Sequence, residues 1–190
     1  MTNSIHREMT PVEASHLHAG YVSVAEITVD GPPSSVWPHV LNMGSWIYDF
    51  HFEHVSGAVD AEGEVEHLWP TSAEGVAGIA DSDRSVDNAT VLKTLKVIPE
   101  KLWYGVNTAK ARDGTSSTGV NLVILSERNG QTLVTAVRSR EALCADGATR
   151  DATQNELTKY QPIAQFRWTD KYMPRLKELA ERSLRGAPTR

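Results

Sequence analysis

Four polar residues that fall in strand-like segments could together carry out general acid–base chemistry. They are His67, Lys93, Tyr104 and Glu141. A histidine exchanges protons near neutral pH, and a carboxylate in a cavity of low dielectric acquires a raised pKa. Such a set suits proton transfer to and from a bound carbonyl compound. The alternative for Lys93 and Glu141 is that both lie in solvent at an edge of a sheet.

The orientation of His67 follows from the alternation of side chains in residues 63–71. Successive side chains of a strand point to opposite faces. Glu64 and Glu66 share one face and suit solvent. His67 and Trp69 are therefore expected to point inward.

The same argument applies to the strand-like segment 131–143. Arg138 and Arg140 share one face, which we assign to solvent. The opposite face, which includes Val137 and Glu141, is then expected to face the interior.

The segments 90–98 and 102–108 alternate less clearly. In the first, Lys93 shares a face with three apolar residues, although the opposite face also carries leucine and isoleucine. In the second, we expect the face of Tyr104 to point inward rather than the face of Trp103. These assignments place Lys93 and Tyr104 with the other two candidates.

Metal binding and covalent catalysis have weaker support in this sequence. All seven histidines precede residue 68, and the pairs His16/His18 and His51/His54 have ligand-like spacing. Strand-bound residues three positions apart do not share a face, however, and neither pair forms a known metal motif. Cys144 has no histidine near it in the sequence. No phosphate-binding or dinucleotide-binding glycine pattern occurs. We predict no metal and no cofactor.

Composition narrows the class of protein. A chain of 190 residues is long enough for one domain with a substantial core, and its formal net charge of −5 argues against a nucleic-acid partner. A single cysteine excludes an internal disulfide. No apolar run is long enough to span a membrane, and the start of the chain lacks the pattern of a signal peptide. We expect a cytoplasmic protein, of undetermined oligomeric state.

The elements that must position the candidates are mostly strands. After the turn Gly31-Pro32-Pro33, a short helix is expected, capped by Ser34 or Ser35 with Pro38 in its first turn. A second short helical segment is expected at 45–50. The predicted strands are 21–30, 52–60, 63–71, 90–98, 102–111, 118–127 and 131–143.

The predicted strands are followed by one long helix over residues 162–184. Its mostly apolar face includes Phe166 and Met173, and Pro174 should kink it or mark a restart. The small and polar residues of 71–90 predict a mobile loop at the mouth of a cavity. Segment 144–161 is a polar connection without a clear pattern.

This order of elements predicts an α+β fold. A single antiparallel sheet needs a cover for its apolar face, and only the C-terminal helix is long enough. We therefore expect a bent seven-stranded antiparallel sheet around that helix. A helix does not fill the concavity of so wide a sheet, so a ligand cavity is expected between them.

The chain resembles the START/polyketide cyclase/SRPBCC superfamily, which shares the helix-grip fold of the major birch pollen allergen. The resemblance lies in the first strand with "GPPSSVWPHVLNMGSW", in "VIPEKLWYG" and in "MPRLKELAERS". It covers about residues 21–185, which we expect to form a helix-grip domain between a polar arm at 1–20 and a tail at 186–190. The N-terminal arm and the segments 71–90 and 144–161 depart from the family pattern.

The resemblance implies a cavity for a small hydrophobic molecule, aromatic or polyketide-like, and leaves several functions open. The first is a cofactor-independent cyclase, dehydratase, lyase or hydrolase that uses His67, Lys93, Tyr104 and Glu141. The second is a non-catalytic carrier or sensor. A third, a co-chaperone, predicts no deep cavity. The residues expected to contact the ligand are Trp46, Phe50, Trp69, Val137, Phe166 and Met173.

Overall fold

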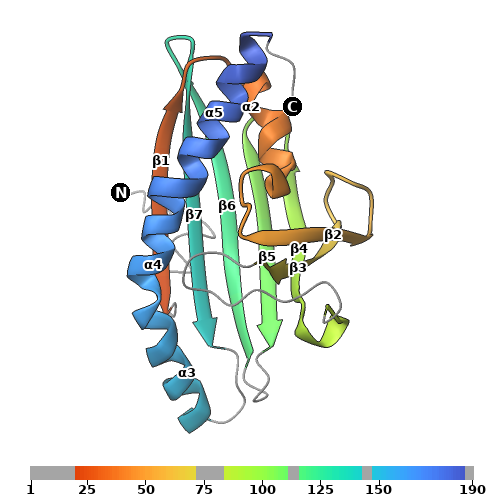
Figure 1. The fold of residues 1–190 in the computed structure, drawn as a ribbon, viewed down its shortest axis with the longest axis vertical. Helices are drawn as coiled ribbons and strands as arrows, with labels where there is room; N and C mark the ends of the chain where they lie inside the picture. The colour runs from red at the N-terminus through yellow and green to blue at the C-terminus, as the bar shows by residue number, and fades with distance from the viewer. Residues whose placement is uncertain (1–19, 72–83, 111–115, 143–146, 187–190) are drawn as a thin grey trace, which may run out of the picture.

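Seven strands form one antiparallel sheet in the order β1-β7-β6-β5-β4-β3-β2 (Figure 1). The computed structural model describes residues 20–71, 84–110, 116–142 and 147–186. The sheet is strongly bent, and β2 runs across the direction of β5 and β6 (Figure 1). The strands are β1 (Tyr21–Val29), β2 (Phe50–Ser56), β3 (Val65–Pro70), β4 (Thr90–Ile98), β5 (Leu102–Lys110), β6 (Ser116–Arg128) and β7 (Gln131–Ala142).

The seven predicted strands are confirmed, with ends that differ by a few residues. Asn129 and Gly130, between β6 and β7, have φ values of 54° and 77°. Positive φ at both central residues is the requirement of the tight hairpin turn that an Asn-Gly pair predicts. The predicted arm over 1–19, most of the predicted loop (72–83), Cys144 and the end of the predicted tail (187–190) lie outside the described residues.

Two short helical elements follow β1, as expected, but their details differ. Helix α2 (Pro33–Leu41) already contains Ser34 and Ser35, the two predicted caps, and its N-cap is Pro32, without a side-chain cap. Pro38 is therefore inside the helix, not in its first turn. The second element is the single 3₁₀ turn η1 (Met43–Ser45), just before the range expected for it.

The C-terminal helical region consists of four consecutive segments. The polar connection contains helix α3 (Gly147–Lys159), which the sequence pattern did not predict. Helix α4 (Gln161–Phe166), the π-helical segment η4 (Arg167–Tyr172) and helix α5 (Met173–Leu184) then follow. Because Pro174 lacks an N–H, it cannot complete an ordinary helical hydrogen bond one turn back. The helix widens before Pro174 and restarts as α5, which confirms the expected role of this proline.

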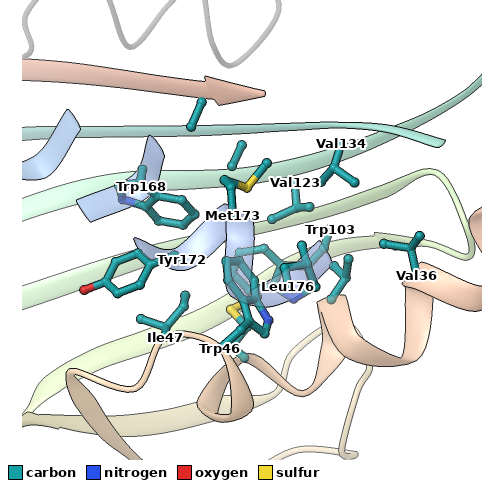
Figure 2. Close-up of a cluster of buried hydrophobic side chains, with 14 of the residues drawn as sticks. Val36, Trp46, Ile47, Trp103, Val123, Val134, Trp168, Tyr172, Met173 and Leu176 are labelled. Atoms are coloured by element: carbon teal, nitrogen blue, oxygen red, sulfur yellow. The ribbon is translucent and has the colours of Figure 1, made fainter. Parts of the chain in front are cut away.

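The helical region packs on the concave face of the sheet, where it forms the core with α2 and η1. Leu176, Trp46 and Trp168 are at most 4% exposed. The rings of Trp46 and Trp168 meet edge to face at 5.8 Å between centroids, close to Met173 (Figure 2). Trp37, on the same helix as Val36, also belongs to this core.

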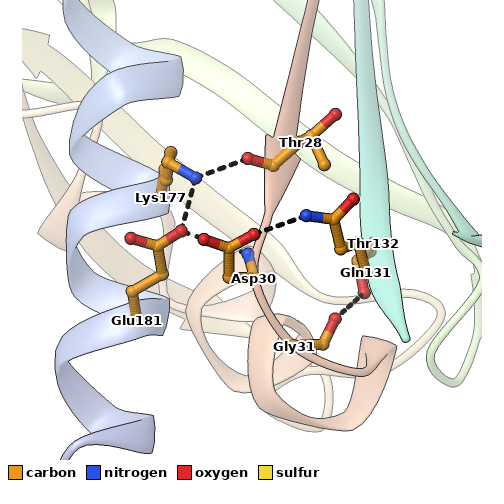
Figure 3. A network of polar contacts seen from close by, with 7 residues as sticks. All are labelled: Thr28, Asp30, Gly31, Gln131, Thr132, Lys177 and Glu181. Carbon is orange, nitrogen blue, oxygen red and sulfur yellow. Dashed lines mark hydrogen bonds and ion pairs between the residues drawn. The ribbon is translucent and has the colours of Figure 1, made fainter. Parts of the chain in front are cut away.

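A polar network fixes α5 to the end of β1 (Figure 3). Lys177 Nζ donates to the Thr28 carbonyl at 2.7 Å and forms an ion pair with Glu181. Glu181 Oε1 accepts from the backbone N–H of Asp30 at 3.1 Å, and the Asp30 carboxylate accepts from Gln131 Nε2 at 2.6 Å. These contacts set the position of the long helix above the sheet.

Candidate functional site: a cavity between sheet and helix

A cavity of about 50 Å³ lies between the concave face of the sheet and the helical region. Most of its wall is apolar and includes four aromatic side chains, from β2, β5 and η4. We call it the inner chamber. Its lining residues are Met43, Ile47, Phe50, Phe52, Leu68, Thr90, Leu92, Trp103, Asn107, Asn121, Val123, Arg138, Arg140 and Trp168.

A second space of about 290 Å³, the outer chamber, adjoins the first. The two share five lining residues: Phe50, Thr90, Arg138, Arg140 and Trp168. The outer chamber is lined further by residues of β1, α3, α4 and η4, among them Tyr21, Tyr160, Arg167 and Tyr172. Together the chambers provide an elongated site with the size of a small ligand pocket.

Arg138 and Arg140 of β7 line both chambers, so the expectation that they face solvent is wrong. The Nε atom of each is buried and has no hydrogen-bond partner among the described residues. Burial, together with the neighbouring charge of Arg138, lowers the pKa of Arg140 to about 10. The Arg140 guanidinium therefore stays charged at neutral pH, and both arginines hold unused donors at the cavity.

Asn107 of β5 and Asn121 of β6 are polar residues in the lining of the inner chamber. They occur in the sequence as two Gly-Val-Asn repeats, 105–107 and 119–121, which pair so that each asparagine lies across from the glycine of the other. A Cβ atom at Gly119 would lie 2.8 Å from Asn107 Oδ1 and 2.4 Å from a backbone carbonyl oxygen. The glycine therefore provides the room that the Asn107 amide occupies.

The Asn107 carboxamide has two orientations with different partners. In one, its oxygen accepts from Asn121 Nδ2 at 3.2 Å. In the other, its nitrogen donates to the Gly119 carbonyl at 3.1 Å, and its oxygen accepts from Arg140 Nη2 at 3.1 Å. The second orientation satisfies both ends of the amide and so is favoured. In it, Asn107 holds the guanidinium of Arg140 in place.

A second polar cluster, at the outer chamber, joins Asp49 to the π-helical segment. Tyr172 donates its hydroxyl proton to Asp49 Oδ2 at 2.9 Å, and Arg167 Nε lies 3.6 Å from the same oxygen. Asp49 is 3% exposed, and its other oxygen, Oδ1, has no partner in the described part of the chain. Burial, followed by the hydrogen bond to Asp49, raises the pKa of Tyr172. The hydroxyl therefore keeps its proton at neutral pH.

The structure places His67 and Trp69 on the convex face, so the expectation that they point inward is wrong. Residues 66 and 68 of β3 face the concavity instead. They pair with Leu92 and Thr90 of β4, whose side chains line the inner chamber. Trp69 is nevertheless 3% exposed, because the 3₁₀ turn η3 (Val86–Asn88) covers it and Asn88 Oδ1 accepts from its Nε1 at 2.9 Å. His67 lies against Trp69 with an edge-to-face ring contact of 5.7 Å.

The other three acid–base candidates also lie on the convex face. Lys93 is exposed, and Leu92 beside it lines the inner chamber. Tyr104 is partly buried, whereas Trp103 points into the chamber. Glu141 follows Arg140 and therefore has the opposite orientation. The four candidates are not brought together at the cavity.

Of the six residues expected to contact a ligand, Phe50 alone is among those that line the two chambers. Trp46 is fully buried in the core, where its Nε1 donates to the His39 carbonyl at 2.9 Å. Met173 is also a core residue. Val137 and Trp69 are each buried on the convex face, on different strands. Phe166 points away from the cavity and is 52% exposed.

The predictions of which strand faces point inward were wrong for a common physical reason. The convex face also buries apolar side chains, with Leu122 and Val137 each 4% exposed, so apolar alternation does not distinguish the two faces. Charged residues were assigned to solvent, but here a cavity contains two of them. The repeated Gly-Val-Asn was the available signal, because an asparagine in a central strand rarely lacks a polar role.

A further cleft of about 540 Å³ near β2 and β3 is lined by three carboxylates and two histidines, and it shares three lining residues with the inner chamber. Glu64 is 7% exposed and accepts from His54 Nδ1 at 3.1 Å and from the Asp60 backbone N–H at 2.8 Å. Glu66 lies beside this pair. Within the described ranges, no three His, Cys, Asp or Glu side chains are arranged to hold a metal ion.

Comparisons with known proteins extend these observations at the level of fold. No protein-family model and no curated protein matches the sequence. Among solved structures, the Zhui aromatase/cyclase from Streptomyces sp. R1128 is similar, with a TM-score of 0.61 and 12% identity over 88% of this chain and 98% of that one. The protein MLL2253 from Mesorhizobium loti has a TM-score of 0.51 and 15% identity over 85% and 98% of the respective chains.

The fold and its cavity define a helix-grip protein: a bent seven-stranded antiparallel sheet wrapped around a long C-terminal helix. The similarity to the aromatase/cyclase supports this assignment of the fold. Among the described residues, no helix has both the length and the apolar character needed to cross a membrane.

Proposed function

We propose that this protein is a cofactor-independent enzyme that acts on a small, largely apolar molecule, aromatic or polyketide-like, in the two chambers. The reaction is of cyclase, dehydratase, lyase or hydrolase type. The observation that carries the proposal is the convergence of Arg138, Arg140 and Tyr172 on a space with otherwise mostly apolar walls. A few polar groups in an apolar pocket are the usual composition of a ligand site.

The arginines and the Asp49–Tyr172 pair have different roles in this proposal. Arg138 and Arg140 bind oxygen atoms of the substrate and orient it. The Tyr172 hydroxyl takes a proton from the substrate as it passes its own proton to Asp49, to which it is already hydrogen-bonded at 2.9 Å. That proton moves along the existing hydrogen bond to Asp49 Oδ2, and the proton from the substrate remains on the Tyr172 oxygen. This pair replaces the acid–base residues expected from the sequence.

Turnover and binding of Tyr172→Phe and Asp49→Asn test the proposal. A panel of aromatic and polyketide-like carbonyl compounds is assayed with the native protein and both variants. Removal of the proton path should lower the turnover rate by about 10²–10⁴-fold while ligand affinity changes little. Tyr104→Phe, on the convex face, is the matched control and should keep full activity. Full activity of Tyr172→Phe, with loss in Tyr104→Phe, would refute the assignment.

A carrier or sensor is the second candidate. The linings of the two chambers support it, because their titratable residues within the described part of the chain are all arginines and tyrosines. Neither type titrates near neutral pH in its ordinary range. Tight binding of a panel compound, without conversion of any compound by the native protein, would establish this function instead of the enzyme.

A further inference from the structure

Two arginines, Arg138 and Arg140, enter the cavity from the same face of β7, and no described residue is an acidic partner of either. We propose that they bind the anionic group of the ligand, so that the ligand is a hydrophobic carboxylic acid. Its carboxylate lies against β7, and its apolar body lies between Trp103 and Trp168. This inference rests on the proposed function only in requiring that a small molecule occupies the chambers.

The charge of the cavity supports an anion. The described residues that line the two chambers include Arg138, Arg140 and Arg167, and no aspartate or glutamate. Arg167 is compensated by Asp49, 3.6 Å away. Arg138 and Arg140 have no such carboxylate among the described residues, and like charges on one strand face repel. Buried cations are normally paired, so a bound anion supplies the missing charge.

The unused donors of this site fit a carboxylate. The Nε atoms of Arg138 and Arg140 are both buried and have no hydrogen-bond partner in the part of the chain that the structure describes. A guanidinium presents its donors in a planar fork that matches the two oxygens of a carboxylate. Asn107, which accepts from Arg140 Nη2 at 3.1 Å, fixes the orientation of that fork. Buried donors without partners are costly, and a carboxylate would satisfy them.

The remaining wall fits an apolar body next to the carboxylate. Trp103, Phe52 and Leu68 line the inner chamber, and Trp168 lines both chambers. Trp168 Nε1 is another buried donor without a partner in the described ranges. The outer chamber, at about 290 Å³, is at the small end of the range for ligand pockets. A compact ring system suits this volume better than a long acyl chain.

The test compares 2-naphthoate with 2-naphthamide, which have nearly the same shape and differ in charge. Binding to the full chain is measured by isothermal titration calorimetry at pH 7. We expect 2-naphthoate to bind at least tenfold more tightly than the amide, and inorganic phosphate, which has no apolar body, to bind at least tenfold more weakly than 2-naphthoate.

Variants assign this preference to the arginines. Arg138→Gln and Arg140→Gln should each reduce 2-naphthoate affinity at least tenfold and leave 2-naphthamide affinity within about threefold. Arg128→Gln, an exposed residue at the β6–β7 turn, makes the same change of net charge and should have no effect. Arg140→Lys keeps the charge without the fork and should give an intermediate affinity, which provides a second measurement if Arg140→Gln does not fold.

The outcomes separate this inference from the proposed function. Equal affinity of the native protein for 2-naphthoate and 2-naphthamide would overturn the inference and leave the cavity as a binding site. An equal loss in Arg128→Gln and Arg140→Gln would also overturn it, because the effect would then come from net charge. If phosphate binds as tightly as 2-naphthoate, the site takes small oxyanions, and the hydrophobic-acid ligand is refuted. Absence of binding by every compound would refute both the inference and the binding step of the proposed function.

Discussion

Glu66 provides a test of the strand orientation that the structure assigns to β3. It points to the concave side, beside the buried Glu64 and near Asp60 and His54. Burial, followed by the charges of Glu64 and Asp60, raises the pKa of Glu66 to about 7, whereas His54 opposes this shift. A solvent-facing Glu66, as expected from the sequence, would not have such a pKa.

The sign and size of the effect on stability follow from the pKa. Because Glu66 binds its proton more tightly in the folded state, the folded protein loses stability as pH rises from the ordinary value of 4.5 through about 7. The shift corresponds to about 3 kcal/mol at most. Solvent screening of this partly exposed carboxyl reduces the expected value to about 1–2 kcal/mol. Glu66→Gln removes the charge and should stabilise the protein by this amount above pH 7.

Urea denaturation of the native protein and of Glu66→Gln at pH 5 and pH 8 measures the effect. The gain in the free energy of unfolding should be about 1–2 kcal/mol at pH 8 and clearly smaller at pH 5. Glu53→Gln, at an exposed position on the neighbouring strand, is the control and should change stability by less than about 0.5 kcal/mol at either pH. An equal effect of Glu66→Gln at both pH values, or a loss at pH 8, would show that Glu66 is not in this environment.

Two further predictions concern the packing of the cavity and the core. Gly119→Ala should destabilise the fold by about 1–3 kcal/mol and weaken 2-naphthoate binding, since the added Cβ would lie 2.4 Å from the Ser139 carbonyl oxygen and 2.8 Å from Asn107; unchanged stability and affinity would contradict this packing. Leu176→Ala, at a fully buried site, should lower the free energy of unfolding by about 2–5 kcal/mol in urea denaturation. Leu184→Ala, at a 47% exposed site, should cost far less, and similar losses in the two variants would contradict the assigned core.

Part of the candidate site could not be predicted from the sequence, because it depends on residues that are far apart in the chain. Asp49 and Tyr172 are separated by 123 positions in the sequence, and a hydrogen bond joins them beside the outer chamber. Tyr172 lies in the π-helical segment, which widens before Pro174. The proline predicted a change in the helix, but the sequence did not indicate which side chains that change would direct toward Asp49.

Local chemistry in the sequence determined the elements and their order. Asn129-Gly130 set the β6–β7 turn, and alternating β-branched residues set strands such as β1. One long amphipathic C-terminal segment then required a sheet that wraps around it, which fixed the helix-grip class. These features depend on neighbouring residues, whose spacing the sequence shows directly.

The tertiary structure alone decided which face of each strand meets the cavity. Alternation separates side chains into two sets but does not say which set is inside, and here both faces of the sheet bury apolar residues. The pairing of the strands in the sheet turned Arg138 and Arg140 of β7 inward. It turned His67 of β3, Lys93 of β4 and Tyr104 of β5 outward. A shift of one position exchanges the two faces of a strand. The packing of the whole sheet against the helix therefore selected the residues of the site.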